Sequence, residues 1–360
     1  MKFMDKWTAV FVALGVSTMM GGCSDDGYKY RFRFKECKEL VVKVGGINWH
    51  YIRNGDEAII VMASGYSAST AHDEINLPAA LDGVPVRMVC GSVFRSDSRV
   101  QSLIIPEGVS DIGTLSFAGT KIDRVYIPSS VTNIDMNAFS GSACKSFSVS
   151  DHNAYFSSVN GWLCTRDGKR LVRAAWGETE VPLGVEEIPN CAFSLNGIKS
   201  VALPDSVEHI GLNAFFGCEN LVHVSIPRKV RNITAFMFEG CVNLESVDFS
   251  GAVTNIGPYA FEGCKSLTSL EIPEGVVRID EYAFANCKSL RVVTIPSSVK
   301  YIGAYAFSGC GKEMRVNMAI SDAVICPNAF SSRNHLMKAR GMESEPDMIE
   351  TEIPLDVLMK

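Results

Sequence analysis

The chain has 360 residues, of which 47% are hydrophobic and 21% are charged, and its formal net charge at pH 7 is −6. This composition is typical of a folded protein, because it supplies enough apolar side chains for a continuous core. The lack of a basic excess argues against a nucleic-acid partner.

The first residues predict a targeting segment. Lys2 and Lys6 precede an apolar run, Trp7 to Met20, which is too short to span a bilayer and fits a signal peptide over residues 1–22. Residues 20–23 read Met-Gly-Gly-Cys, which resembles the lipobox of bacterial lipoproteins. The resemblance implies lipidation of Cys23 and an exported protein anchored to the bacterial outer membrane or cell surface. The alternative is an ordinary signal peptide whose cleavage leaves a free Cys23.

An Ala-Phe pair, or a near variant, returns every 22 or 23 residues through most of the chain. The phenylalanines are Phe94, Phe117, Phe139, Phe193, Phe215, Phe238, Phe261, Phe284, Phe307 and Phe330. Only the step from Phe139 to Phe193 is longer, at 54 residues, which indicates an insertion in one coil. This period predicts a solenoid, because a single coil cannot bury its own apolar face and must stack on its neighbours.

Each repeat predicts a short strand followed by turns. In Leu270 to Ile272 apolar and polar residues alternate, so one side of the strand faces the core. Pro273 ends the strand because it has no N–H for the ladder. Val276 and Ile279 then bring a second short segment inward. The predicted fold is a repeat solenoid, mostly β, with about ten coils that place like residues above like.

These residues resemble a known family, the BspA-like leucine-rich repeats of bacterial surface proteins. The family pattern, roughly Leu-x-x-Val-x-Ile-Pro-x-x-Val-x-x-Ile-x-x-x-Ala-Phe-x-x-Cys, matches Leu267 to Cys287 with few departures. The resemblance covers about Asn76 to Phe330 and implies a leucine-rich-repeat-like coil. One departure is Ser250, which stands in place of the proline and puts the shape of its coil in doubt.

The same family resemblance implies the domain organisation. Ile47 to Val61 and Gly83 to Val86 resemble its N-terminal β cap, and the insertion at about 143–181 resembles its extended hairpin coil. The Asp167-Gly168 step independently predicts a tight turn between strands of that hairpin. The expected order is a lipidated N-terminus and β cap over 23–75, repeats over 76–330, and a C-terminal cap or tail over 331–360.

Five of the twelve cysteines share one repeat position: Cys218, Cys241, Cys264, Cys287 and Cys310. Side chains that point the same way do not meet disulfide geometry, and parallel thiolates cannot surround one ion tetrahedrally. We expect buried structural thiols, with disulfide pairs or a metal site as the alternatives. Six further cysteines lie off this ladder and could form disulfides, although the sequence does not identify their partners: Cys37, Cys90, Cys144, Cys164, Cys191 and Cys326.

Catalytic motifs are missing from the sequence. It has no glycine-rich phosphate loop, no His-Glu-x-x-His and no nucleophile elbow, and its six histidines do not recur in register with a carboxylate or nucleophile. The basic residues crowded in the hairpin, Arg166, Lys169, Arg170 and Arg173, are explained by a solvated strand face. We therefore expect no enzymatic activity, no cofactor and no metal.

The outward strand positions predict a partner-binding face. Arg124 and Tyr126 make one part of it cationic and aromatic, and Asp248 and Glu271 make another part acidic. His223 occupies the same repeat position as Arg124. Extended solenoid surfaces bind large partners through many modest contacts. The alternative is a plain solvated sheet face.

Three functions remain open. The family resemblance implies a non-enzymatic, lipid-anchored surface protein that binds host, matrix or other cell-surface proteins. A glycan-binding accessory protein for surface nutrient capture would need clustered exposed aromatics, for which Trp49, Trp162 and Trp176 are the candidates. A structural envelope protein without a specific ligand is the third.

Overall fold

The computed structural model describes residues 38–65, 74–90, 93, 94, 102–251, 253–318, 323–330 and 335–338. Within these ranges every regular element is a β-strand. The described chain divides into two compact units, one ending at Gly168 but including Val172–Trp176, the other comprising Lys169–Leu171 and the residues from Gly177 on. The predicted signal peptide, Cys23 and Cys37 lie outside the described residues.

The N-terminal unit begins with an antiparallel meander. β1 (Leu40–Val44) pairs with β2 (Ile47–Asn54), which pairs with β3 (Glu57–Ser64). Burial alternates along β2, so Trp49 and Tyr51 face the core.

The cap sheet continues directly into the first coils. β3 pairs in parallel with β6 (Val84–Val89), which also pairs with the short β5 (Ala80–Leu81), and the sheet runs on through β8 (Asp111–Ile112) and β10 (Asn133–Ile134). Its order is β1-β2-β3-β6-β8-β10. The predicted β cap is therefore hydrogen-bonded to the solenoid through β6.

A second sheet of the N-terminal unit carries the other strand of each coil. Its order is β11-β9-β7-β4, all parallel: β4 (Glu74–Asn76), β7 (Ser102–Ile104), β9 (Arg124–Ile127) and β11 (Ser146–Val149). Apolar residues at alternate positions of β9 point into the core between the two sheets.

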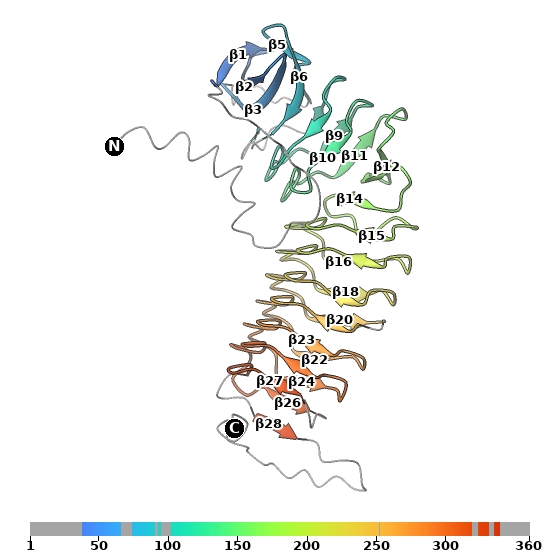
Figure 1. Ribbon diagram of the computed structural model, residues 1–360, viewed down its shortest axis with the longest axis vertical. Helices are drawn as coiled ribbons and strands as arrows, with labels where there is room; N and C mark the ends of the chain where they lie inside the picture. The colour runs from blue at the N-terminus through green and yellow to red at the C-terminus, as the bar shows by residue number, and fades with distance from the viewer. Residues whose placement is uncertain are drawn as a thin grey trace, which may run out of the picture. The chain divides into compact units, whose positions relative to one another are not determined.

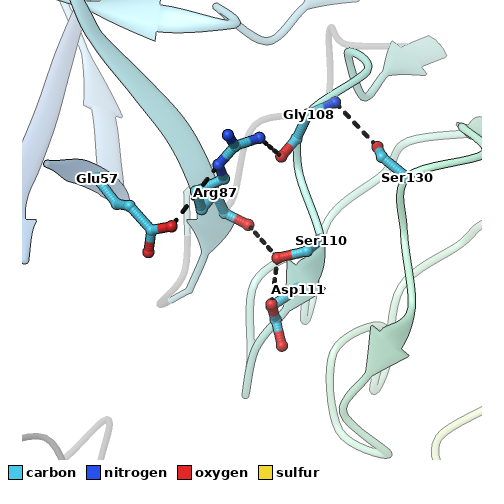
Figure 2. A network of polar contacts seen from close by, with 6 residues as sticks. All are labelled: Glu57, Arg87, Gly108, Ser110, Asp111 and Ser130. Carbon is cyan, nitrogen blue, oxygen red and sulfur yellow. Dashed lines mark hydrogen bonds and ion pairs between the residues drawn. The ribbon is translucent and has the colours of Figure 1, made fainter.

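Polar contacts join the cap strand β6 to the first coils (Figure 2). The Arg87 guanidinium donates to the Gly108 carbonyl at 2.8 Å and lies 3.7 Å from a Glu57 carboxylate oxygen. The Ser110 hydroxyl donates to the Arg87 carbonyl at 3.3 Å, and the Gly108 amide donates to the hydroxyl of Ser130 at 3.0 Å. Since these contacts bridge successive strands, they hold the register between the cap and the repeats.

The insertion is a hairpin, as predicted. β12 (Phe156–Val159) pairs antiparallel with β13 (Trp162–Thr165), and β14 (Leu171–Arg173) follows in the same sheet. The two-residue turn Asn160-Gly161 has φ values of 51° and 81°, as a type I′ turn requires. The predicted Asp167-Gly168 turn lies between β13 and β14. The prediction of a solvated basic face was wrong for Arg173, because this residue is only 3% exposed.

The C-terminal unit repeats the two-strand coil, and Figure 1 shows its strands stacked one above another from β16 onward. One set of strands forms two parallel sheets: β16 (Ser200–Val201), β18 (His223–Ile226) and β20 (Ser246–Phe249), then β22 (Ser269–Glu271), β24 (Val292–Ile295), β26 (Arg315–Met318) and β28 (His335–Lys338). The other set comprises β15 (Glu187–Ile188) with β17 (His209–Ile210), then β19 (Asn232–Ile233), β21 (Asn255–Ile256), β23 (Arg278–Ile279), β25 (Tyr301–Ile302) and β27 (Val324–Ile325).

The sheet of the first set breaks between β20 and β22. This is the coil where Ser250 replaces the usual proline, followed by Gly251. A Cβ on Gly251 would lie 2.5 Å from the Arg228 carbonyl oxygen, so the backbone approaches the preceding coil closely here. The irregular sequence thus coincides with the break in this sheet, while the other strand set continues through β21 and β23.

The predicted phenylalanine spine is present in both units. In the C-terminal unit the rings from Phe193 to Phe330 stack face to face, with centroids 4.6–5.2 Å apart and interplanar angles of 3–20°. In the N-terminal unit Phe117 stacks on Phe139 at 5.2 Å, and Phe147 meets Phe139 edge-on. These rings are at most 4% exposed, so each coil completes the core of its neighbour.

The residue two places before the spine phenylalanine adopts a left-handed conformation in eight coils. Its φ lies between 55° and 59° at Leu115, Cys191, Asn213, Phe236, Tyr259, Tyr282, Tyr305 and Asn328. This conformation is unfavourable for a bulky side chain. The backbone path of the coil therefore imposes a conformational free-energy cost at this residue, which packing and hydrogen bonds elsewhere in the coil must offset.

Candidate functional site

The predicted partner-binding face is exposed, but it falls into separate parts. In the N-terminal unit Arg124 and Tyr126 occupy alternate positions of β9 and both point to solvent, Tyr126 with 38% exposure. In the ladder Arg124 lies between Ser102 and Ser146. Small neighbours therefore leave the Arg124 side chain accessible, whereas Tyr126 lies between Ile104 and Ser148.

In the C-terminal unit the structure brings His223 and Asp248 together. His223 Nε2 lies 3.6 Å from an Asp248 carboxylate oxygen, and its Nδ1 is 2.9 Å from the Ser246 hydroxyl. The His223 side chain is 44% exposed and that of Asp248 67%. The parallel register of β18 and β20 explains this, because His223 pairs with Ser246 and Ser225 with Asp248.

Glu271 lies on the next sheet, beyond the break between β20 and β22. It is exposed opposite Thr294, with no ion-pair partner among the residues that the structure describes. Arg124 and Tyr126 belong to one unit, and in the other unit His223 with Asp248 lies on one sheet and Glu271 on the next.

Sequence reasoning missed a basic hollow on the other strand set of the C-terminal unit. A hollow of about 550 Å³ is lined by Glu208, His209, Ile210, Arg228, Lys229, Arg231, Asn232 and Thr234. Lys229 is partly neutralised, since its ammonium group lies 2.6 Å from a Glu208 oxygen. The arginines and lysine stand in a turn and directly before the strand β19, a spacing that the apolar repeat pattern does not reveal.

A second missed feature is an aromatic ladder, consisting of Phe236, Tyr259, Tyr282 and Tyr305. Its rings stack in parallel with centroids 4.8–5.0 Å apart, and Tyr305 is 37% exposed. Burial raises the pKa of Tyr259, and the nearby charges of Tyr282 and of Glu262 raise it further. This ladder therefore adds a partly exposed, acidic aromatic surface to four successive coils.

The ladder cysteines are structural, as predicted. None of the five forms a disulfide, and each is at most 8% exposed. Burial raises the pKa of Cys241, Cys264 and Cys287 above its usual range, so these sulfurs stay protonated and unreactive. The off-ladder cysteines within the described ranges form no disulfide either.

The described residues contain no group of three or more His, Cys, Asp or Glu side chains arranged to hold a metal ion. No helix in the same part of the chain has the length and hydropathy needed to cross a membrane.

The aromatic residues proposed for glycan binding are largely buried. Trp49 and Trp162 are each 1% exposed, and the Trp49 indole donates to the Val44 carbonyl at 3.3 Å. Trp176 is half-buried. The exposed aromatic cluster that a glycan site would need is therefore absent at Trp49 and Trp162.

Stacked two-strand coils with a phenylalanine spine define a leucine-rich-repeat type of solenoid of about 10 turns. The model of the family described as the BspA type leucine-rich repeat region matches in six copies, over residues 73–159, 186–314 and 254–343. These matches cover more than half of the chain. The chain belongs to the BspA-type leucine-rich repeat family.

Solved structures of bacterial repeat proteins are similar to this chain. The pneumococcal vaccine antigen PcpA is 13% identical, covering 83% of this chain and 94% of its own, with a TM-score of 0.46. A leucine-rich cell surface protein from Faecalibacterium prausnitzii is 21% identical, covering 85% and 99%, with a TM-score of 0.43. A leucine-rich repeat protein from Eubacterium ventriosum is 18% identical, covering 76% and 95%, with a TM-score of 0.45. No curated protein matches the chain.

Proposed function

We propose that this is a lipid-anchored surface protein of bacteria, which binds proteins of a host, of the matrix or of other cells through the exposed strand face of its repeats. Membership of the BspA-type family supports the surface location. The apolar run before Cys23 and the lipobox-like residues support export and anchoring at Cys23. The repeats themselves act by binding and perform no chemistry.

The observation that carries this proposal is the register of exposed side chains in the C-terminal unit. On β18, β20 and β22 the inward residues pack in the core, while His223, Asp248 and Glu271 point outward. Parallel strands of one sheet lie about 4.8 Å apart, so on each of the two sheets a partner meets an ordered array of polar groups. Since the array is preorganised, binding loses little conformational entropy.

A binding screen with paired variants tests the proposal. The mature chain is immobilised and exposed to a panel of matrix and cell-surface proteins, then Asp248→Lys and Glu271→Lys are compared with Glu219→Lys, an exposed residue in a turn. We expect saturable binding that the face variants weaken about tenfold or more and the turn variant leaves unchanged. Equal binding by all three variants would place the binding surface elsewhere.

The anchor is tested separately. Cys23→Ser should move the protein from the membrane fraction to the soluble one, because lipidation requires the cysteine thiol. Membrane fractionation followed by mass measurement of the N-terminal peptide reads this out. An unmodified Cys23 peptide in the wild-type protein would contradict the anchor and leave the repeat proposal standing.

A further inference from the structure

Three side chains on the outer face of the cap sheet form a relay of hydrogen bonds. His50 Nδ1 lies 2.5 Å from a Glu39 carboxylate oxygen, and His50 Nε2 lies 2.7 Å from the Ser64 hydroxyl oxygen. A carboxylate only accepts, so Nδ1 carries a proton, and the tautomer with its only proton on Nδ1 can accept the Ser64 proton at Nε2. This is the arrangement of a nucleophile, its base and the group that orients the base.

The strand register produces this arrangement. His50 is at the centre of β2, opposite Val41 on one side and Met62 on the other. Glu39 is two residues before Val41, and Ser64 is two residues after Met62, so both reach His50 diagonally on one face. The three residues come from three adjacent segments, which is why the sequence alone did not connect them.

A β-bulge lies directly beside the histidine. The register between β2 and β3 shifts between His50 and Tyr51, which leaves Val61 as the extra residue on β3. Bulges re-aim side chains and are frequent next to active sites. Alternation along β2 turns Tyr51 to the core and His50 to the outer face, and on β3 the bulge separates Ile60, the buried partner of Tyr51, from Met62, the exposed partner of His50.

The residues around Ser64 supply a donor and an apolar contact surface. A Cβ on Gly65 would lie 2.3 Å from Asn48 Nδ2, so the Asn48 amide rests against the backbone that follows Ser64. Asn48 is also the ladder partner of Ser64, which places an N–H donor beside the nucleophile. Val41 and Met62 flank His50 with 55% and 40% exposure.

We propose that Ser64, His50 and Glu39 form a nucleophilic site that hydrolyses carboxylic esters with a small apolar acyl group. Ser64 Oγ attacks the carbonyl carbon while its proton passes to His50 Nε2. The bond to the alcohol oxygen breaks, and that oxygen takes the proton from Nε2. Water then adds to the acyl-serine through the same base, which releases the acid and restores the Ser64 hydroxyl.

The other two residues of the site, Glu39 and Asn48, position the imidazole and stabilise the oxyanion. Glu39 holds the imidazole in the tautomer that accepts from Ser64, and Asn48 donates to the oxyanion that forms on the carbonyl oxygen. This activity goes beyond the binding proposed for the repeats, and it revises the sequence-based expectation of a chain without enzymatic activity.

The repeats contain a looser arrangement that serves as an internal control. His223 has Ser246 at 2.9 Å, but the nearest Asp248 oxygen is 3.6 Å away, beyond hydrogen-bond distance. Its side chain is 44% exposed, against 15% for His50. Ser246 should therefore react much more slowly than Ser64 with the same reagent.

The test is covalent labelling of the full chain with an alkyl fluorophosphonate, which forms an Oγ–P bond and loses fluoride. Peptide mapping by mass spectrometry compares Ser64 with Ser246, and p-nitrophenyl acetate hydrolysis is followed in parallel. We expect Ser64 to be labelled at least tenfold faster than Ser246. His50→Gln should slow labelling about 100-fold or more, and Ser64→Ala should abolish ester turnover.

The variant Glu39→Gln provides a second reading, because the Glu39 side chain is half exposed and we expect its substitution to leave the fold intact. It should slow labelling of Ser64 while circular dichroism and the urea unfolding midpoint stay unchanged. Equal labelling of Ser64 and Ser246, or labelling that neither His50→Gln nor Glu39→Gln slows, would overturn the proposal and leave a cross-strand structural contact.

Discussion

The Cys264 thiol donates to the carbonyl oxygen of Phe238, one coil earlier, at 3.3 Å. The same contact recurs along the ladder: Cys218 to Phe193, Cys241 to Phe215, Cys287 to Phe261 and Cys310 to Phe284, at 3.0–3.2 Å. Each buried sulfur thus fills space beside the spine and satisfies a carbonyl of the preceding coil. The repeated cysteine is explained by packing and hydrogen bonding between coils.

Replacing a ladder thiol should therefore destabilise the C-terminal unit. Cys264→Ala removes a fully buried sulfur and its hydrogen bond, and we expect a loss of about 1–2 kcal/mol in the free energy of unfolding. Urea unfolding measures this change. The control is Cys326→Ala, at a half-buried position off the ladder, which should cost less. Equal losses would show that the ladder position has no special role.

Alkaline pH should weaken the N-terminal unit through its buried thiols. Burial raises the pKa of Cys164 from 9.0 to about 11 and is the main cause that raises the pKa of Cys144 to about 12. Above pH 9 the unfolded chain loses these protons first, so the free energy of unfolding falls as pH rises towards 11. Each thiol contributes about 1.4 kcal/mol per pH unit in that window.

Urea unfolding at pH 8, 9 and 10 tests this dependence. The double variant Cys144→Ala and Cys164→Ala should start from a lower stability at pH 8 and then lose less of it with rising pH. A wild-type stability that is the same at pH 8 and pH 10 would contradict burial of these thiols.

The aromatic ladder can be tested at Tyr282, whose φ is 56°. Tyr282→Asn and Tyr282→Leu both lose two stacked pairs, worth about 0.5–1.5 kcal/mol each. Asparagine tolerates the left-handed conformation, whereas leucine, like tyrosine, pays a conformational cost of about 1 kcal/mol there. We expect stability to decrease in the order tyrosine, asparagine, leucine, as thermal unfolding would show. A leucine variant as stable as the asparagine variant would refute the backbone argument.

Arg87 should contribute to stability where an equally basic surface residue does not. Arg87→Ala removes the donor to the Gly108 carbonyl and the contact with Glu57 (Figure 2), at an expected cost of about 1 kcal/mol. Arg124→Ala, on an exposed strand position, is the matched control and should change stability by less than about 0.5 kcal/mol. Equal effects in a urea titration would mean that Arg87 does not join the cap to the coils.

Much of the fold could be predicted because it follows from one repeated pattern. The spacing of Phe238, Phe261 and Phe284 requires stacking, and the register of the cysteines follows from it. The left-handed residue before each pair was missed, since tyrosine at positive φ runs against the preference of an isolated residue. Only the path of the whole coil imposes it.

The functional positions were harder to predict. Exposure of Arg124 and Asp248 follows from alternation along a strand, but the sequence does not show the sheet break that separates Asp248 from Glu271. Burial of Trp49 and Trp162 depends on the cap and hairpin, where no repeat pattern applies. For the same reason His50 did not stand out in the sequence.

A crystal structure that resolves the aromatic rings of the C-terminal unit is the most direct test of the stacked coils. It should show Phe238, Phe261 and Phe284 face to face, with centroids about 5 Å apart and sealed from solvent. Rings scattered among unrelated pockets, or turned towards water, would contradict the shared core on which the exposed faces depend.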